Sequence, residues 1–487
     1  MESLTRSFLP HLLAVQKHQE WGWTDGWSDG RYSVKPPIGP RTHNTSHYEQ
    51  EGDSDELEEE ECDLSVSLPD EILEKILSSL PIANILRAGV VCKRWNTITT
   101  SRRFLSLCEE NGHASYGPWY FMYREAQSSK GLAYDPGARK WHGFTLPCPD
   151  GNWVFVASSS NGLVCFANVL DGYSLYVCNP MNNMWRKMPE TYGWYSDYYA
   201  VSLMVDKIMK HQEIVVARST QIQEDYSRWE FRIEVCVSSS ISSSSAAPPM
   251  PVSSLTTSSS SSSSMSSSPF AISSSRSCMS SSPLSLKSHM WITRVNTVLM
   301  GWRGGDNSVI CNGVFYCVIH STAMVGISES RHGLVSYDLS TGVLEVASIP
   351  MPCCLTCVKL INCCEKLIMV GGIGKYDIVR GIGIWELIAG SGGKLKSTHD
   401  IGITRVWKEI SRMPNKFFRG FGEFDDVFSS SGRGDLIYIH AYGSPQLLLF
   451  SLKHRSWRWS QKCPMVKKHP LHLFTGFCFE PNLNACP

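Results

Sequence analysis

A unit of about fifty residues repeats through residues 116–483 of this chain and limits the folds open to it. Short apolar segments of the kind that form strands alternate with turn residues. In each unit one such segment contains a tryptophan or a leucine that serves here as a marker, and in most units this segment ends at a proline. The spacings between successive markers are 44 to 63 residues once residues 239–288 are left out, a period typical of propeller blades. The sequence therefore predicts an all-β propeller of about six blades. The markers are Trp141, Trp185, Trp291, Leu344, Trp407 and Trp457.

A serine-rich block at residues 238–288 interrupts this repeat. Such a polar tract buries too little surface to offset its ordering entropy, so we expect it to be disordered. The apolar segments on either side, Phe231–Val235 and Trp291–Val295, would form a hairpin of ordinary length without it. We therefore expect the block to lie inside one turn of one blade. At the end of the chain, Phe474–Phe479 is expected to close the ring beside Trp119–Tyr123.

Residues 1–63 hold few aliphatic side chains and end in an acidic run from Glu49 to Glu61. Like charges along a short segment repel one another and favour a solvated chain. We expect a disordered N-terminal region that ends in an acidic linker.

Residues 64–110 differ from both neighbouring regions, because their apolar side chains follow a helical period. Pro69 suits a first helical turn, whereas Pro81 ends that helix and opens a second apolar run. A three-helix unit of this size is marginal alone, so its excess apolar surface is expected to dock on another protein. The first helix carries one apolar stripe, made of Leu68, Ile72, Leu73, Ile76, Leu77 and Leu80.

The order of these residues, from Leu68-Pro69 to Leu80-Pro81 and on to the CKRW segment Cys92–Trp95, closely resembles the F-box. The F-box is the adaptor-binding module of SCF ubiquitin ligases. The resemblance therefore implies an SKP1-like adaptor and, through it, a cullin and a RING subunit. Spacing alone leaves open which side chains face the adaptor and which face the module's own core. The residues expected to bind the adaptor are Leu68, Pro69, Ile72, Leu73, Ile76, Leu77, Leu80, Pro81, Val91 and Trp95.

The repeated region resembles the kelch-repeat domain of plant F-box/kelch proteins, although the paired glycines survive clearly only at Gly371-Gly372. Together the two resemblances imply the substrate-recognition subunit of an SCF-type ubiquitin ligase, whose propeller recruits a protein substrate. In a four-stranded meander, alternate connections emerge on opposite faces, so the loops between blades open opposite the serine-rich block. Their aromatic and arginine residues are of the types enriched at interfaces. Those expected to bind substrate are Trp153, Tyr192, Trp194, Tyr195, Tyr198, Trp302, Arg303, Phe417, Phe418 and Arg419.

Composition and motifs argue against other classes of function. The net charge is zero, which disfavours a nucleic-acid binder, and no apolar run approaches the ~20 residues of a membrane span. Neither a nucleophile elbow nor a zinc-protease motif occurs, and Val370–Tyr376 matches only part of a phosphate loop. We expect a non-catalytic protein without cofactor, metal, nucleic-acid or membrane partner, in the nucleus or the cytoplasm.

The 18 cysteines point to a reducing compartment and to free thiols. One group of them contains a CxxC spacing that could serve a zinc site with further ligands. However, the adjoining segments Val358–Ile361 and Leu367–Val370 are typical of strands, and cysteines at strand positions are the preferred interpretation. The group comprises Cys353, Cys354, Cys357, Cys363 and Cys364.

Two other functions stay open at this point. One is a propeller-based scaffold or transcriptional co-regulator that does not depend on ubiquitination. The other, less favoured, is a propeller metalloenzyme.

Overall fold

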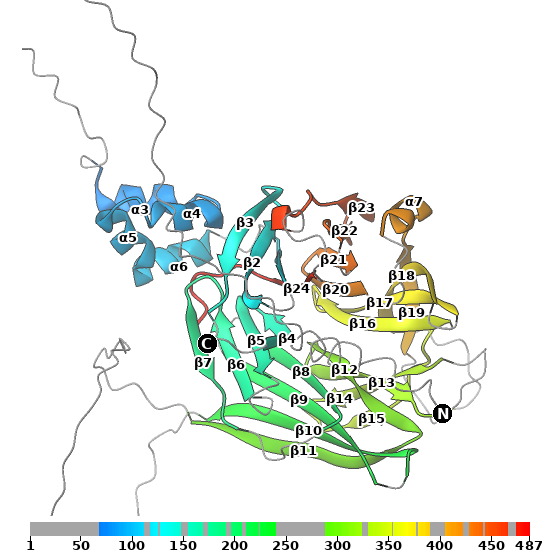
Figure 1. Cartoon of the computed structure of the whole chain (residues 1–487). Coiled ribbons are helices and arrows are strands. Elements are labelled where there is room, and N and C mark those ends of the chain that lie inside the picture. The colour runs from blue at the N-terminus through cyan, green and yellow to red at the C-terminus, as the bar shows by residue number, and fades with distance from the viewer. Residues whose placement is uncertain are drawn as a thin grey trace, which may run out of the picture. The chain divides into compact units, whose positions relative to one another are not determined.

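The computed structural model describes residues 68–111, 117–124, 127–147, 154–168, 174–190, 196–206, 211–223, 225–239, 288–323, 330–352, 354–375, 378–389, 405–421, 428–441, 444–465 and 474–487. These residues form a small helical module followed by a β-propeller (Figure 1). No helix within these ranges is long and apolar enough to cross a membrane.

The helical module holds four helices, one more than the three expected. They are α3 (Asp70–Ser78), α4 (Ile82–Ala88), α5 (Lys93–Thr100) and α6 (Arg102–Glu110). Helix α6 forms because Ser101 accepts a hydrogen bond from the Phe104 backbone N–H at 3.2 Å, a side-chain cap. It also buries Phe104 and Cys108 in the centre of the module. The module core comprises Leu73, Leu77, Ile85, Ala88, Ile98, Phe104 and Cys108.

The propeller consists of six four-stranded antiparallel sheets, which we number as blades in chain order. Blade 1 joins β24 (Phe474–Phe479) to β1 (Trp119–Arg124), β2 (Gln127–Asp135) and β3 (Lys140–Thr145). Blade 2 holds β4 (Val154–Ser160), β5 (Leu163–Asn168), β6 (Ser174–Asn179) and β7 (Met184–Lys187). Blade 3 holds β8 (Tyr198–Val205), β9 (Gln212–Gln221), β10 (Arg228–Ser239) and β11 (Ser288–Met300).

The remaining three blades follow the same order. Blade 4 holds β12 (Trp302–Cys311), β13 (Val314–Ser321), β14 (His332–Asp338) and β15 (Leu344–Val346). Blade 5 holds β16 (Leu355–Cys363), β17 (Lys366–Lys375), β18 (Ile378–Ala389) and β19 (Arg405–Arg412). Blade 6 follows α7 (Asn415–Phe418) and the 3₁₀ turn η2 (Arg419–Phe421), and holds β20 (Phe428–Arg433), β21 (Leu436–Ala441), β22 (Leu448–Ser451) and β23 (Ser456–Trp459).

The ring closes as the sequence predicted, because the last strand of the chain joins the first blade. β24 pairs antiparallel with β1, with Phe479 opposite Trp119 and Phe474 opposite Arg124. β24 is also the innermost strand of its blade, and it contacts the innermost strands of blades 2 and 6. The other innermost strands contact one another in order around the ring. Blade 1 is thus completed by two strands, β1 and β24, that lie at opposite ends of the propeller sequence.

The serine-rich block falls within a single hairpin. β10 and β11 pair along their length, so Val235 lies opposite Ile292 and the hairpin ends with Ser239 opposite Ser288. The predicted partnership of the two flanking segments is therefore confirmed. Residues 240–287 and the predicted acidic N-terminal region lie outside the described residues.

The marker residues of the repeat all lie on the outermost strand of their blades. Contacts between neighbouring blades explain why tryptophan recurs at these positions. Three of the tryptophans donate a hydrogen bond from the indole nitrogen to the preceding blade. Trp141 donates to the Gln461 carbonyl at 2.9 Å, Trp291 to the Pro189 carbonyl at 2.8 Å, and Trp457 to the Ser411 hydroxyl at 3.1 Å. A large ring with one polar donor suits such a contact between blades.

Candidate functional site

The apolar stripe of α3 divides into a buried half and an exposed half. Leu73 and Leu77 are 4% and 1% exposed and belong to the module core. Ile72 and Ile76 are 47% and 46% exposed. Their aliphatic side chains project from a helix whose opposite side is already packed, so they are available to a partner.

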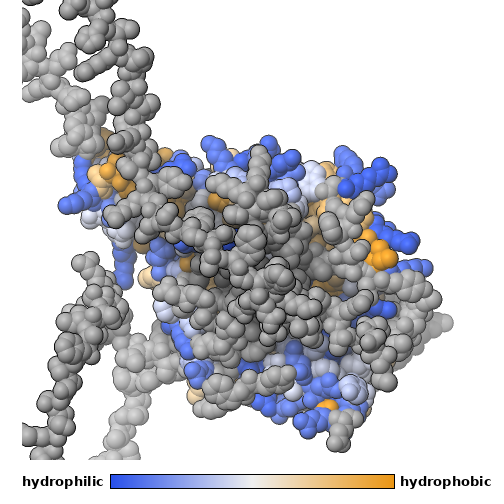
Figure 2. All heavy atoms as spheres, in the orientation of Figure 1, coloured by the Kyte–Doolittle hydropathy of each residue, from blue (hydrophilic) through white to orange (hydrophobic). Residues whose placement is uncertain are grey.

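Three more apolar side chains of the module are exposed, at the end of α4 and in the turn that follows it. These are Leu86, Val90 and Val91, and Val90 is 85% exposed. Figure 2 shows hydrophobic atoms at the surface of this module. Sequence reasoning chose Val91 but omitted Leu86 and Val90, although both lie in an apolar run that ends just before the CKRW segment.

The other residues expected to bind the adaptor occupy intermediate positions. Leu80 and Trp95 are partly buried against the module core, and Leu68 is half-buried at the start of α3. Pro69 and Pro81 are exposed immediately before α3 and α4. The ten predicted residues therefore include two core residues, three that are partly buried, and five that face solvent: Pro69, Ile72, Ile76, Pro81 and Val91.

Polar contacts between helices fix the exposed face. The Arg94 guanidinium forms an ion pair with Asp70 at 2.7 Å and donates a hydrogen bond to the Leu68 carbonyl, which ties α5 to the start of α3. The Asn111 amide donates to the Ser78 hydroxyl at 2.9 Å, which ties the end of α6 to the end of α3. Both ends of α3 are thus held, and the exposed isoleucines lie between them.

On the propeller, the predicted substrate-facing side is the side at which the innermost strands begin. The hairpin that holds the serine-rich block joins a third strand to a fourth, so the block emerges on the opposite side. Trp153, Tyr192, Trp194 and Tyr195 lie outside the described residues. Tyr198 begins β8, Trp302 and Arg303 begin β12, and Phe417, Phe418 and Arg419 lie in α7 and η2.

Three of these aromatic residues pack between strands. Trp302 is partly buried against the core shared by blades 3 and 4. Phe417 and Phe418 pack against the core shared by blades 5 and 6, and the Phe417 ring lies 6.1 Å from that of Trp459. Arg419 is exposed. Packing therefore accounts for the aromatic character of Trp302, Phe417 and Phe418.

Two predicted residues from neighbouring blades meet directly. The Arg303 guanidinium carbon lies 4.2 Å from the centre of the Tyr198 ring, a cation–π contact between β12 and β8. The other side of this contact is also aromatic, because the Tyr198 ring lies 5.6 Å from the Trp229 ring. The Trp229 indole nitrogen in turn donates to the Tyr226 carbonyl at 3.1 Å. The structure thus brings Tyr198 and Arg303 together on the side that strand order predicted.

Further polar residues surround Arg303, and sequence reasoning missed all of them. Arg303 lies opposite His320, and His320 lies opposite His332, so the three side chains share one face of blade 4. The two imidazole rings are 5.0 Å apart. The Lys359 ammonium of blade 5 lies 3.9 Å from the Asp306 carboxylate. We name this group, together with Tyr198, the channel-mouth cluster: Tyr198, Arg303, Asp306, His320, His332 and Lys359.

A strand irregularity places Asp306 in this cluster. The register of β12 and β13 shifts between Gly304 and Ser308, so that residues 305–307 bulge from the strand. The bulge is anchored on the next blade, because the Asn307 side chain accepts a hydrogen bond from the Leu360 N–H at 2.6 Å. A bulge of this kind has no sequence signature strong enough to predict it.

Burial shapes the charge of the channel-mouth cluster. Burial lowers the pKa of His332 to about 4, and burial together with the nearby His332 and Arg303 lowers the pKa of His320 to about 3. Burial also lowers the pKa of Arg303, and the Lys359 ammonium lowers that of Asp306. At neutral pH the cluster therefore carries two cations, one carboxylate and two neutral imidazoles.

Part of the cysteine group lies on a strand, as the preferred interpretation expected, whereas Cys354 lies in the turn before β16. Cys357 is on β16, Cys363 ends it, and Cys364 is in the turn to β17. Cys353 lies outside the described residues. Across the described part of the chain, no group of three or more His, Cys, Asp or Glu side chains is placed to hold a metal ion.

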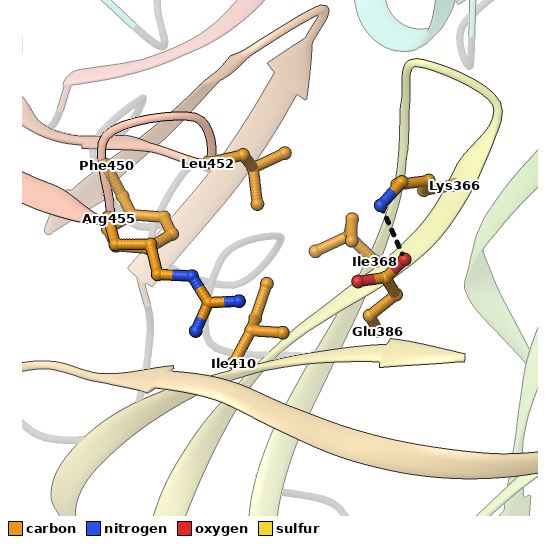
Figure 3. Close-up of a pocket in the computed structure, with 7 residues that line it drawn as sticks. All are labelled: Lys366, Ile368, Glu386, Ile410, Phe450, Leu452 and Arg455. Carbon is orange, nitrogen blue, oxygen red and sulfur yellow. Dashed lines mark ion pairs between the residues drawn. The ribbon is translucent and has the colours of Figure 1, made fainter. Parts of the chain in front are cut away.

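A small hollow lies between blades 5 and 6, near the turns of the side that bears the serine-rich block (Figure 3). Its volume is about 90 Å³, well below the ~300 Å³ of a small-molecule site. Lys366 and Glu386 form an ion pair at 2.9 Å on one wall, and Arg455 lies on the other.

The comparison with known proteins agrees with this architecture. A family model described as F-box-like matches residues 66–108, which span all but the last residues of the helical module. An F-box/kelch-repeat protein of Arabidopsis thaliana is 42% identical over 459 residues, covering 90% of this chain and 94% of that protein. F-box only protein 6 of the same species is 24% identical over 93% of this chain and 82% of its own length.

A third relative from Arabidopsis thaliana, SKP1-interacting partner 15, is 25% identical over 86% of this chain and 98% of its own length. The similarity to these relatives extends through both the helical module and the propeller. The chain therefore belongs to the plant F-box/kelch-repeat family.

Proposed function

We propose that this protein is a non-catalytic substrate receptor of an SCF-type ubiquitin ligase. The observation that carries the proposal is the exposure of Ile72 and Ile76 on α3, beside a module core that is complete without them. An exposed pair of isoleucines on a fixed helix is costly in water and is stabilised by burial against a partner. An SKP1-like adaptor is the partner proposed here, because a relative over most of the chain is named as an SKP1-interacting partner.

In this proposal the propeller supplies the second surface. Through the adaptor, a cullin and a RING subunit bring a charged conjugating enzyme close to the substrate bound on the propeller. Ubiquitin transfer is then accelerated because substrate lysines are held at a high effective concentration, and this chain contributes binding rather than chemistry.

The test compares proteins labelled by proximity to the full chain with and without proteasome inhibition. Under the proposal, a subset of labelled proteins accumulates on inhibition and is ubiquitinated, and Ile76→Asp abolishes both effects. Val343→Asp is the matched control, since Val343 is 56% exposed in the β14–β15 turn on the other side of the propeller from the channel-mouth cluster.

Two results would contradict the proposal. Labelled proteins whose ubiquitination is the same with Ile76→Asp would indicate a route that does not use the F-box. Labelled proteins that never change with proteasome inhibition would favour a scaffold or co-regulator instead.

A further inference from the structure

We infer that Arg303 is the anchor for an acidic side chain of the recruited protein. This inference rests on the proposed function, because it names the class of residue that the propeller would recognise. It concerns the channel-mouth cluster and not the helical module.

Arg303 forms no ion pair within the described residues, although the Asp306 carboxylate, which is paired with Lys359, acts on its charge from a longer distance. Its guanidinium is half-buried against Tyr198, and the hydrogen bond that it donates within the described residues, to the Gly304 carbonyl, is long at 3.5 Å. Within the described residues, no carboxylate lies within ion-pair distance of it. Burying a guanidinium without an anion is unfavourable, and its planar set of donors fits a carboxylate in two parallel hydrogen bonds.

A neighbouring arginine of the same kind has the partner that Arg303 lacks. Arg218 stacks on Tyr199 with its guanidinium carbon 5.1 Å from the ring centre, much as Arg303 stacks on the adjacent Tyr198. Arg218, however, forms an ion pair at 3.2 Å with Glu234, and both side chains are buried. Blade 3 therefore holds an arginine–tyrosine pair completed by a carboxylate, whereas the pair that Tyr198 of blade 3 forms with Arg303 of blade 4 has no ion-paired carboxylate among the described residues.

Among the described residues, the surroundings of the Arg303 guanidinium offer further polar nitrogens, and the carboxylates near it already have partners. His332 is 6% exposed, and its imidazole lies beside the backbone of Leu355 and Thr356. It shares a face of the sheet with Arg303 through His320. Of the nearby carboxylates, Asp306 is paired with Lys359, and Asp197 accepts a hydrogen bond from the Gln221 N–H at 2.8 Å. An incoming acid would therefore meet the Arg303 cation beside two neutral imidazoles.

The location of Arg303 suits the same ligand. Arg303, Tyr198 and His332 all lie where strands begin on the side opposite the serine-rich block, which is the side chosen for substrate from the sequence. Arginine and tyrosine are also enriched among interface hot spots. Position, chemistry and the missing partner lead to one ligand class, an acidic side chain.

The experiment selects a displayed random-peptide library against the full chain bound to an SKP1-like adaptor. We expect peptides enriched in Glu or Asp, with affinity that falls as salt rises. For one selected peptide, Arg303→Gln should weaken binding on the order of 30-fold or more, and replacing its central Glu by Gln should have a similar effect. Arg303→Lys, which keeps the charge but not the paired donors, should fall between wild type and Arg303→Gln.

The control is Arg455→Gln, an exposed arginine on the opposite side of the propeller, which should bind the peptide like wild type. The inference is overturned if selection shows no acidic enrichment, or if a selected acidic peptide binds Arg303→Gln as tightly as wild type. Urea unfolding like that of wild type shows that the Arg303 variants keep a folded propeller, and adaptor capture by these variants tests the proposed function separately. Loss of acidic recognition with intact adaptor binding would place the effect on the propeller alone.

Discussion

Ring closure by β24 leads to a quantitative prediction for Phe479→Ala. Phe479 is fully buried at the end of β24, opposite Trp119 in β1. Its ring centre lies 6.4 Å from that of Trp119 and 5.7 Å from that of Phe144. Removing a buried phenylalanine ring from such a core costs about 3–5 kcal/mol, because both the transfer free energy and the contacts around the cavity are lost.

The assay is urea unfolding of the full chain, followed by the summed fluorescence of its 16 tryptophans, to which Trp119 contributes. We expect the midpoint to fall while the slope with urea stays close to that of wild type. Tyr226→Ala is the control, because Tyr226 is 81% exposed and its replacement should change the free energy of unfolding by no more than about 0.5 kcal/mol. A loss for Phe479→Ala no larger than that of Tyr226→Ala would refute ring closure through this strand.

Two further predictions concern pH and a turn. Burial lowers the pKa of His332 and of His440 to about 4, so between pH 6.5 and 4 the folded state binds fewer protons than the unfolded state. The contribution of the two neutral histidines to the free energy of unfolding is complete above pH 6.5 and is lost as the pH falls, by about 2 kcal/mol for each histidine at pH 5. Urea unfolding at pH 6.5 and at pH 5 measures this loss of stability. His440→Gln should lose less stability between the two pH values than wild type does. Gly313 has φ +73°, and a Cβ atom added there would have no other atom within 4 Å. Gly313→Ala should therefore lower the free energy of unfolding by about 1 kcal/mol, from backbone strain alone. The same urea unfolding assay measures this change.

Much of the architecture could be predicted from the sequence, because repetition reveals a unit even when each copy is degenerate. Trp141, Trp291 and Trp457 recur for a physical reason, since each connects its blade to the one before. The pairing of β10 with β11 across the serine-rich block was also predictable, because both flanks keep the apolar character of strands. Helix α6 was missed, because its amphipathic pattern follows a short turn at Ser101 that does not interrupt the preceding helix clearly.

The sites were less predictable than the fold. A helical stripe contains both Ile76 and Leu77, and only the packing of the other helices decides which is exposed. On the propeller, Tyr198 and Arg303 could be assigned to one side from strand order alone. Their direct contact, and the addition of Asp306 by a bulge in β12, depend on the geometry of neighbouring blades that no local pattern records.

The central claim is that the exposed half of the α3 stripe binds the adaptor, and calorimetric titration of the full chain with an SKP1-like adaptor tests it most directly. We predict that the double variant Ile72→Asp, Ile76→Asp binds at least about 100-fold more weakly than wild type, because two carboxylates would be buried in an apolar interface. Its urea unfolding should match that of wild type, since neither residue belongs to the module core, and Val343→Asp should bind normally. Equal affinity of the double variant and wild type would contradict the claim.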